Sequence, residues 1–147
     1  MVNVCKKIKC VSSKIKKAID NTDAFKNDPY LTNVVGWTIG FIFKCNEMGK
    51  EVFQKDVEQE FNINRSTASE LLTTMEGNGF IRREANKNDK RLKTIILTKK
   101  AIELEEKVKD TIIKVESKAL TNFKQEEIEL LMSFLERIYV NLDKKEE

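Results

Sequence analysis

The chain has 147 residues, enough for one ordinary domain with a hydrophobic core and too few for two comfortable ones. Charged residues make up 35% of it and aromatic residues 7%, with one proline and five glycines, which favours long helices over a β-sandwich or barrel. The formal net charge is only +3, so the local distribution of charge must indicate any partner.

The residue types that are missing or rare exclude several kinds of site. Histidine is absent, which removes serine–histidine triads and histidine-ligated metal sites. No glycine-rich phosphate loop and no carboxylate dyad stands out, so we expect no catalytic site, metal or cofactor. Three scattered cysteines and no secretory signal pattern indicate the cytoplasm. The longest uncharged apolar run, residues 34–43, is half of the roughly 20 residues that a membrane span needs, so we expect no membrane insertion.

A narrow apolar seam runs along the first 18 residues between many lysines. Its members recur at alternating steps of four and three: Val4, Ile8, Val11, Ile15 and Ala18. Such a seam is typical of a coiled-coil contact, whereas a helix that lies on its own core has a broader apolar face. We therefore predict that residues 1–31 form an N-terminal dimerisation helix followed by a polar connector from residue 20 onward.

The middle of the chain changes to short elements. We expect one helix between Thr32, a suitable N-cap, and Gly49, a suitable residue to end it. Two shorter helices follow, over residues 54–61 and 65–78, and their three-residue joint is typical of a helix-turn-helix. The apolar residues of the second helix share one face, which leaves short polar residues on the other: Ser66, Ser69, Glu70 and Thr73.

A strongly basic segment comes directly after this pair of helices. Residues 80–84 and 92–97 are β-prone and flank a charged tip, which predicts a β-hairpin with a long loop. Between Arg82 and Lys100 eight basic residues stand against two acidic ones, a charge of +6. Such a patch attracts duplex DNA because neutralised phosphates release counterions. A solvated hairpin is the alternative, but its position after a helix-turn-helix favours contact with the DNA backbone or minor groove.

Two long apolar stripes complete the chain, with a break between them near residues 121–124. We predict that residues 99–147 form C-terminal dimerisation helices. The expected fold is mostly α with a small β-hairpin wing: a winged helix-turn-helix over residues 32–98, flanked by N- and C-terminal dimerisation helices in a single domain, 1–147.

The start of the second short helix carries residue types that suit DNA recognition. Asn64 is an N-cap by type, and the free amides of the first turn can meet a phosphate. Arg65 can pair bidentately with guanine, whereas Glu70 either accepts from a cytosine amino group or repels phosphate. A capped surface helix is the alternative. The remaining candidates are short enough to approach base edges or phosphates: Ser66, Thr67, Ser69 and Thr73.

Residues 52–98 resemble the winged-helix core of the multiple-antibiotic-resistance regulator (MarR) family. Four motifs and a short sequel carry the resemblance: Gln54-Lys55-Asp56-Val57, Asn64-Arg65-Ser66-Thr67-Ala68-Ser69, Gly79-Phe80-Ile81-Arg82-Arg83 and Asp89-Lys90-Arg91, followed by Leu97-Thr98. The resemblance implies that Arg91 enters the minor groove while Asp89 holds its guanidinium, and we expect Lys87 and Lys90 beside it. Phe53 and Glu70 depart from the family, which usually has a Thr or Ser cap and frequently an Arg at these positions.

The family resemblance also implies two kinds of regulation. Relatives often bind phenolic anions between the dimer and DNA modules, and four aromatic residues are candidates for that role: Phe25, Tyr30, Trp37 and Phe41. Core filling is the alternative for most of them. Some members sense oxidants through a cysteine near the dimer helix, where Cys5 and Cys10 stand among lysines that favour a thiolate. An ordinary thiol on a helix flank is the alternative.

These observations predict a cytoplasmic homodimer that binds double-stranded DNA at a roughly palindromic operator. It would act as a sequence-specific transcriptional regulator, with repression as the expected direction, and a small aromatic ligand or thiol oxidation would modulate it. Helix 65–78 would occupy the major groove and wing 80–98 the minor groove. The alternatives are a winged-helix protein–protein interaction module without DNA binding, and a thiol-based redox protein.

Overall fold

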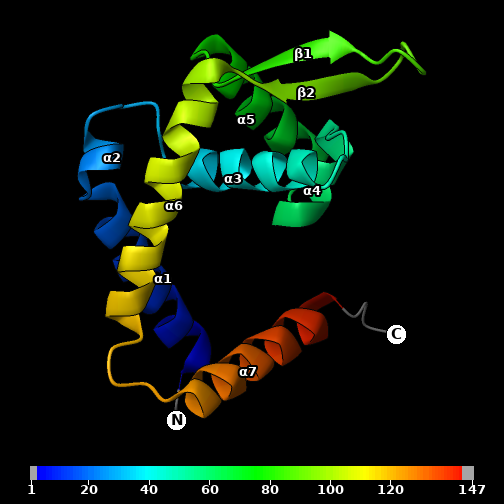
Figure 1. The fold of residues 1–147 in the computed structure, drawn as a ribbon. Helices are drawn as coiled ribbons and strands as arrows, with labels where there is room; N and C mark the ends of the chain where they lie inside the picture. The colour runs from blue at the N-terminus through cyan, green and yellow to red at the C-terminus, as the bar shows by residue number, and fades with distance from the viewer. Residues whose placement is uncertain (1–2, 144–147) are drawn as a thin grey trace.

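The computed structural model describes residues 3–143. The elements follow in the order α1 (Val4–Asp20), α2 (Asp23–Lys26), α3 (Asn33–Glu47), α4 (Gln54–Phe61), α5 (Arg65–Gly77), β1 (Ile81–Ala85), β2 (Lys93–Leu97), α6 (Lys99–Ala119) and α7 (Gln125–Asp143) (Figure 1). The expected fold class, mostly α with a small β-hairpin wing, is confirmed. The outer ends of the two expected dimerisation segments, residues 1–2 and 144–147, lie outside the described residues.

Short polar side chains and glycines set the ends of the main helices. Thr32, Asn64 and Thr98 each accept a backbone N–H in the first turn of the helix that follows, which satisfies one otherwise free donor. Gly49 and Gly79 follow α3 and α5 with φ of +72° and +77°, a conformation that favours glycine at a helix end. The expected boundaries of these helices are confirmed to within a residue or two.

The two short helices are joined by a tight turn. Phe53 offers α4 no side-chain cap, and instead the Asp56 carboxylate accepts the Phe53 backbone N–H at 2.8 Å. Asn62 ends α4 in the left-handed region, at φ 48°, where a short polar side chain is tolerated best after glycine. The chain turns there and enters α5 three residues later, at Arg65.

The hairpin begins one residue later than the sequence suggested. Its strands are antiparallel, with Ile81 opposite Leu97 and Ala85 opposite Lys93. Phe80 is excluded from the strand because its backbone N–H donates to the carbonyl oxygen of Met75, at the end of α5.

The hydrophobic core lies where α3, the helix-turn-helix, the hairpin and α6 meet. Its central members are almost fully buried: Ile39, Ile42, Val57, Leu72, Met75, Phe80, Ile95, Ala101 and Val108. Gly36 brings α3 close to its neighbours, since a Cβ there would lie 3.0 Å from the Phe25 ring and 3.1 Å from a Val108 methyl. A side chain at this position would force those groups apart.

The polar connector contains a helix that the sequence analysis did not predict. The four-residue α2 buries Phe25 in the core, where 5% of the residue stays exposed. This single aromatic anchor orders a segment whose other residues are mostly polar, which is why helical periodicity gives no signal for it.

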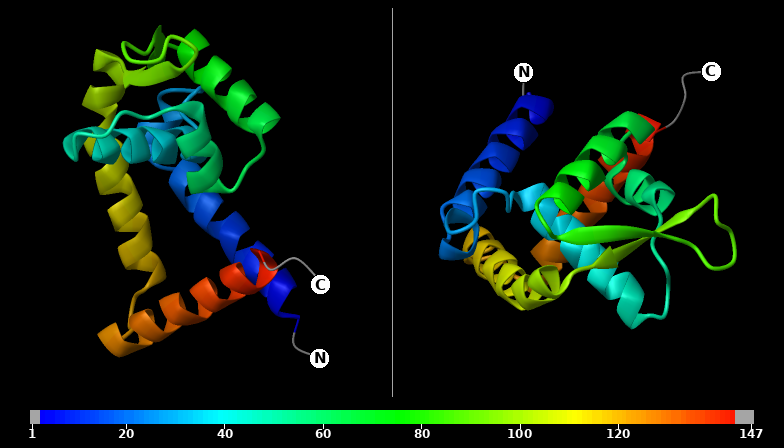
Figure 2. Two further views of the ribbon diagram at one scale, coloured as in Figure 1. Left: turned by 90° about the vertical axis from the view of Figure 1, so that its right-hand side faces the viewer. Right: turned by 90° about the horizontal axis from the view of Figure 1, so that it is seen from above.

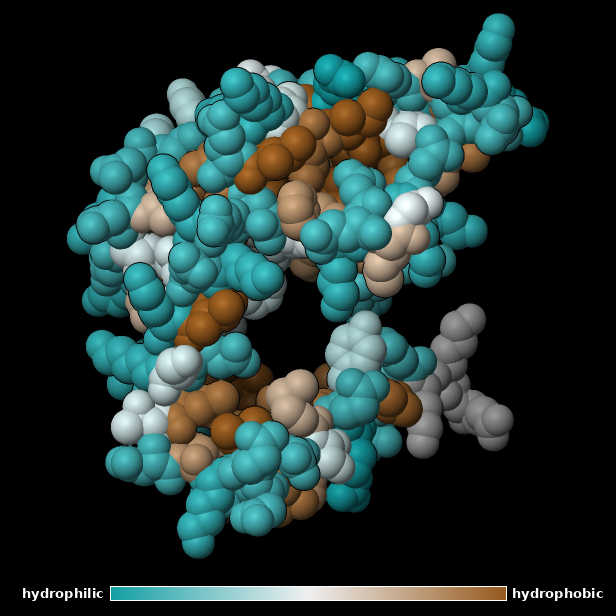
Figure 3. Space-filling model, in the orientation of Figure 1, coloured by the Kyte–Doolittle hydropathy of each residue, from teal (hydrophilic) through white to brown (hydrophobic). Residues whose placement is uncertain are grey.

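The first and last helices carry apolar faces that their own protomer leaves exposed. No residue of α7 is buried, although Leu135, Ile138 and Tyr139 all lie on it. In α1 the predicted seam is also largely exposed at Val4, Ile8, Val11 and Ile15. Helix α7 follows the loop at the lower end of α6 and crosses the end of the molecule at which α1 begins (Figures 1 and 2). Apolar side chains border the opening between α7 and the part above it (Figure 3). Within residues 3–143, no helix has both the length and the apolar character to cross a membrane.

Candidate nucleic-acid interface

Helix α5 has one buried face and one polar face, as its sequence pattern predicts. Ala68, Leu72 and Met75 are at most 1% exposed and fix the helix to the core. The opposite face forms a shallow surface depression, which is lined by Arg65, Ser66, Ser69, Glu70, Thr73 and Thr74. Four of the predicted contact positions therefore share one surface with Glu70: Arg65, Ser66, Ser69 and Thr73.

The first turn of α5 is capped and exposed to solvent. The Asn64 side chain accepts the Thr67 backbone N–H at 2.8 Å, so it caps the helix. Gln54 of α4 donates to the carbonyl oxygen of Arg65 at 3.2 Å and joins the two helices at this point. Arg65, Ser66 and Thr67 are exposed, so their side chains are accessible to a ligand.

The wing tip presents an arginine that is oriented by a carboxylate. Arg91 donates from Nε to Oδ1 of Asp89 at 3.1 Å and from Nη2 to Oδ2 at 3.2 Å. These hydrogen bonds lower the pKa of Asp89 and keep it charged. The Arg91 side chain is 90% exposed, and Lys87 and Lys90 are exposed beside it. The tip is therefore a cluster of accessible cations in which one guanidinium has a defined direction.

Asn86 stabilises the structure of the wing tip, and the sequence analysis did not identify this residue. It is 6% exposed, and its side-chain amide donates to the Glu51 carboxylate and to the Thr94 hydroxyl at 3.0–3.2 Å. The side-chain oxygen Oδ1 of Asn86 accepts the backbone N–H groups of Asn88 and Asp89 at 2.9 and 3.1 Å. Asn86 thus connects the turn before α4 to the residue that orients Arg91. An asparagine that binds backbone two and three residues ahead is a turn signal, available in principle from the sequence.

An ion pair that the sequence analysis also did not identify joins the wing to α5. Arg83 of β1 donates to the Glu76 carboxylate from Nε at 3.0 Å and from Nη2 at 2.7 Å. Its backbone N–H donates to the same carboxylate at 2.9 Å. The side-chain hydrogen bonds from Arg83 lower the pKa of Glu76. No local pattern signals this pair, because it depends on how the hairpin packs on the helix.

The polar face and the basic tip lie at the same end of the molecule. Helix α5 packs against β1, and both views place the hairpin and α5 together, at the end opposite α7 (Figures 1 and 2). The wing projects beyond the helices, as an extension of the surface that α5 presents. This arrangement suits a ligand that is long, negatively charged and grooved.

The aromatic candidates for a small ligand are spread over the structure. Trp37 and Phe41 line an open groove of roughly 700 Å³ between α3 and α6, with Lys44 and Lys109 also lining it. Phe25 instead fills the core beside Gly36. Tyr30 is 57% exposed and does not line that groove.

The cysteines do not form a cluster. Cys5 and Cys10 are exposed on α1, and Cys45 is partly buried against the core. Within residues 3–143, no group of three or more Cys, Asp and Glu side chains is arranged to hold a metal ion.

Comparisons with known proteins agree on the family. Residues 50–93 match the family model described as MarR family. The chain is 30% identical to the transcription regulator MarR from Oenococcus oeni PSU-1, with 93% of this chain and 98% of that chain covered and a TM-score of 0.76. No significant match was found among curated proteins.

Two solved structures with the same fold contain DNA. The S. aureus MepR–DNA complex is 24% identical, with 96% of this chain and 97% of that chain covered and a TM-score of 0.82. A putative MarR family regulator from Listeria monocytogenes, complexed with a 26mer DNA, is 22% identical, with 100% and 99% covered and a TM-score of 0.79. Together with the helix-turn-helix, the wing and the Oenococcus relative, these likenesses show that the chain belongs to the MarR family of winged-helix transcription regulators.

Proposed function

We propose that the protein is a homodimeric repressor that binds a roughly palindromic operator in double-stranded DNA. Helix α5 enters the major groove and the wing follows the adjacent minor groove. The observation that carries the proposal is the common placement of the polar α5 face and the exposed Arg91 at one end of the molecule. The contact residues proposed are Asn64, Arg65, Ser66, Thr67, Ser69, Thr73, Lys87, Lys90 and Arg91, with Asp89 orienting the last.

The exposed apolar faces of α1 and α7 support dimerisation. A soluble protein rarely exposes large contiguous apolar surface unless a partner covers it, and a second copy of the same chain is the simplest partner for both helices. A two-fold dimer would present two α5 helices to successive major grooves, about 34–36 Å apart. The complexes of MepR and of the Listeria regulator with DNA support the choice of duplex DNA over a protein partner.

The groove between α3 and α6 is the proposed effector site. Trp37, 45% exposed, offers a stacking surface there, and charged side chains of both signs line the groove: Lys44 and Lys109 beside Glu47, Glu60 and Glu105. This combination suits a small aromatic molecule whose polar group meets one of the two lysines. Trp37 is the one tryptophan of the chain, so its fluorescence should change when 4-hydroxybenzoate is titrated into the protein, and Lys109→Gln, which keeps Trp37 but removes a lysine of the groove, should weaken that change.

The DNA proposal is tested by binding at several salt concentrations. The wild-type protein should bind a duplex selected from a random pool, with an affinity that falls steeply as salt rises. Arg91→Ala should weaken binding and reduce the magnitude of the logarithmic salt slope by about 0.9, the value for one released phosphate contact. Lys99→Ala is the control, since it removes one exposed charge outside the wing tip. Equal affinity and slope for Arg91→Ala and wild type would show that the wing is assigned wrongly.

A further inference from the structure

The beginning of α6 is tied to the end of α5 by its cap. The Thr98 hydroxyl donates to the carbonyl oxygen of Gly79 at 2.6 Å, and the Thr98 backbone N–H donates to that of Phe80 at 3.1 Å. These bonds join α6 to the first residues after α5. They hold the start of α6 against the residues that follow α5. The rotation of one helix relative to the other is left to other contacts.

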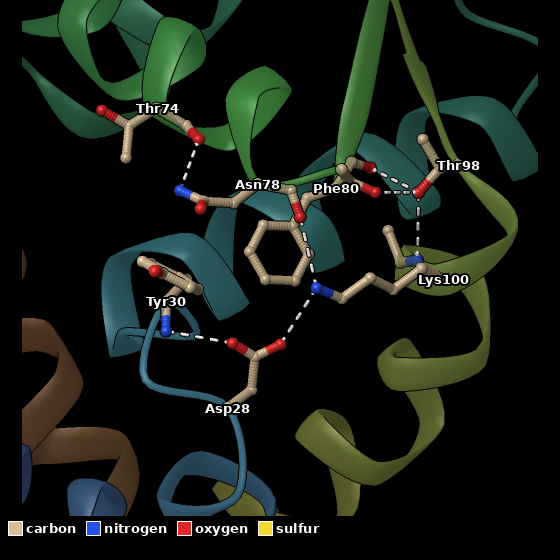
Figure 4. Close-up of polar contacts among 9 residues, drawn as sticks. Asp28, Tyr30, Thr74, Asn78, Phe80, Thr98 and Lys100 are labelled. Atoms are coloured by element: carbon tan, nitrogen blue, oxygen red, sulfur yellow. Dashed lines mark hydrogen bonds and ion pairs between the residues drawn. The ribbon is translucent and has the colours of Figure 1, made fainter.

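Lys100 extends the junction to a third segment (Figure 4). Its Nζ donates to the carbonyl oxygen of Asn78, the residue that ends α5, at 3.2 Å. The same atom lies 3.1 Å from Oδ2 of Asp28, in the segment that leads into α3. It also stands 4.3 Å from the centre of the Phe80 ring. The ammonium group of Lys100, a residue of α6, therefore contacts the end of α5, the residue before β1 and the connector at the same time.

The carboxylate of Asp28 is oriented for its contact with Lys100. Its Oδ1 accepts the Tyr30 backbone N–H at 3.0 Å, which leaves Oδ2 free to face Lys100. The Asp28 side chain is 19% exposed and that of Lys100 is 44% exposed. The adjacent pair of Lys99 and Glu103, by contrast, is 3.8 Å long with side chains 91% and 67% exposed. An ion pair that is partly shielded from water is screened less and holds its geometry better than an exposed one.

The position of the ammonium also suits the end of a helix. The last carbonyl groups of α5 carry partial negative charge, so a cation beside Asn78 is favourable. The ammonium group of Lys100 lies over the ring of Phe80, which is fully buried. These contacts give the side chain little freedom to reach outward toward a separate ligand.

We propose that Lys100, through its ion pair with Asp28, is a positioning residue that sets the angle between the recognition helix α5 and α6. This inference rests on the proposed function, because the angle matters only in a dimer whose two α5 helices meet one operator. Rotation at the junction changes the separation of the two helices. Lys100 therefore controls which half-site spacing is bound, whereas Arg91 contributes attraction to DNA of any spacing.

The competing role for Lys100 is a direct phosphate contact, and Asp28 distinguishes the two. If Lys100 bound phosphate, Asp28→Asn would free its charge and strengthen DNA binding. If Lys100 positions α5, the same substitution removes the pair and weakens operator binding. The two roles thus predict opposite signs for one variant, in which the Tyr30 N–H keeps an oxygen acceptor.

The experiment measures affinity for three kinds of duplex: the operator selected by the wild type, the same operator with one or two base pairs inserted at its centre, and a random sequence. Lys100→Met keeps an unbranched side chain and loses the charge, Lys100→Arg keeps the charge, and Lys99→Met is the matched control. Thermal unfolding verifies that each variant is folded. The double variant of Asp28→Asn with Lys100→Met tests whether the two act as one unit.

Lys100→Met and Asp28→Asn should each weaken operator binding about tenfold, and the double variant should be no weaker than either. Both should discriminate less among spacings and keep wild-type affinity and salt slope on random DNA. Lys100→Arg should restore most of the loss, and Lys99→Met should resemble wild type. Tighter binding by Asp28→Asn, a reduced salt slope for Lys100→Met, or unchanged spacing preference would overturn the inference while the proposed function stood. Failure of the wild type to bind any duplex would overturn both.

Discussion

Glu76 of the recognition helix and Arg83 of the first wing strand share three hydrogen bonds, two from the guanidinium and one from the backbone N–H. The Arg83 guanidinium also lies 3.4 Å from the Thr73 hydroxyl, on the polar face of α5. The pair therefore links the two parts of the proposed interface, α5 and the wing.

This link predicts a pH-dependent contribution to stability. Because Arg83 lowers the pKa of Glu76 in the folded protein, the pair stabilises the fold above the unfolded value of about 4.3, and this contribution is lost as the pH falls through the lower folded pKa. Glu76→Gln should reduce the free energy of unfolding at pH 7 by at most about 1 kcal/mol, since the Glu76 side chain is 37% exposed. Urea unfolding at pH 7 and in acid measures the difference, which should shrink in acid.

Glu84→Gln is the control for that measurement. Glu84 pairs with Arg82 on the same strand, but both side chains are more than half exposed, so its replacement should change stability little at either pH. A difference between wild type and Glu76→Gln that stayed constant from pH 7 into acid would contradict the linkage.

Asn86→Ala should disorder the wing tip. The change removes the acceptor for the backbone N–H groups of Asn88 and Asp89, at a cost of about 1–3 kcal/mol if they find no other partner. DNA affinity should fall as far as in Arg91→Ala, and the double variant should lose no more. Asn88→Ala is the matched control, because Asn88 is exposed at the same tip. Normal salt-dependent binding by Asn86→Ala would show that Arg91 needs no such support.

Glu70→Gln tests the residue that departs most from a DNA-attracting face. Glu70 lines the polar surface of α5, where in the proposed complex its carboxylate would either repel phosphate or accept from the amino group of cytosine. The variant should bind random duplexes more tightly and discriminate less at one base pair of the selected operator, by about 1–3 kcal/mol. Glu106→Gln, on α6, removes the same charge elsewhere. If the two variants behave alike, Glu70 does not face the groove.

A charge placed in the exposed apolar seam should prevent association. Val11→Glu on α1 or Leu135→Glu on α7 would bury an unpaired carboxylate in the proposed dimer, which costs several kcal/mol. Sedimentation should then show a single protomer, and operator affinity should fall. Lys14→Glu, on the charged side of α1, should stay dimeric. A wild-type protein that sediments as one protomer would contradict the dimer directly.

Local sequence signals predicted the helix-turn-helix and the wing because their evidence lies within a few residues. N-caps such as Asn64, helix-ending glycines such as Gly79, and a one-sided apolar pattern act over three or four positions. The polar face of α5 was predictable for the same reason. The strand boundary at Phe80 was missed although its cause is also local: the Phe80 backbone N–H bonds to the carbonyl oxygen of Met75, five residues earlier, as part of the helix end at Gly79.

The positioning contacts were beyond local signals. Asp28 and Lys100 are distant in the chain, and only the packing of α6 beside the connector brings them together. Glu51 and Asn86 are likewise joined by the fold. Among the aromatic candidates, the sequence offered no way to separate Phe25, which fills the core, from Trp37, which lines a groove. Hydrophobic side chains obey the same periodicity in both settings.

The close approach at Gly36 has a mechanical consequence. Because a Cβ at position 36 would lie 3.0 Å from the Phe25 ring and 3.1 Å from a Val108 methyl, there is no room for a side chain between α3 and its neighbours α2 and α6 at that point. Gly36 and Val108 also line the groove between α3 and α6, so this contact forms part of the groove wall. A side chain at position 36 would therefore change the shape of the groove and the packing of α3 on α6 together.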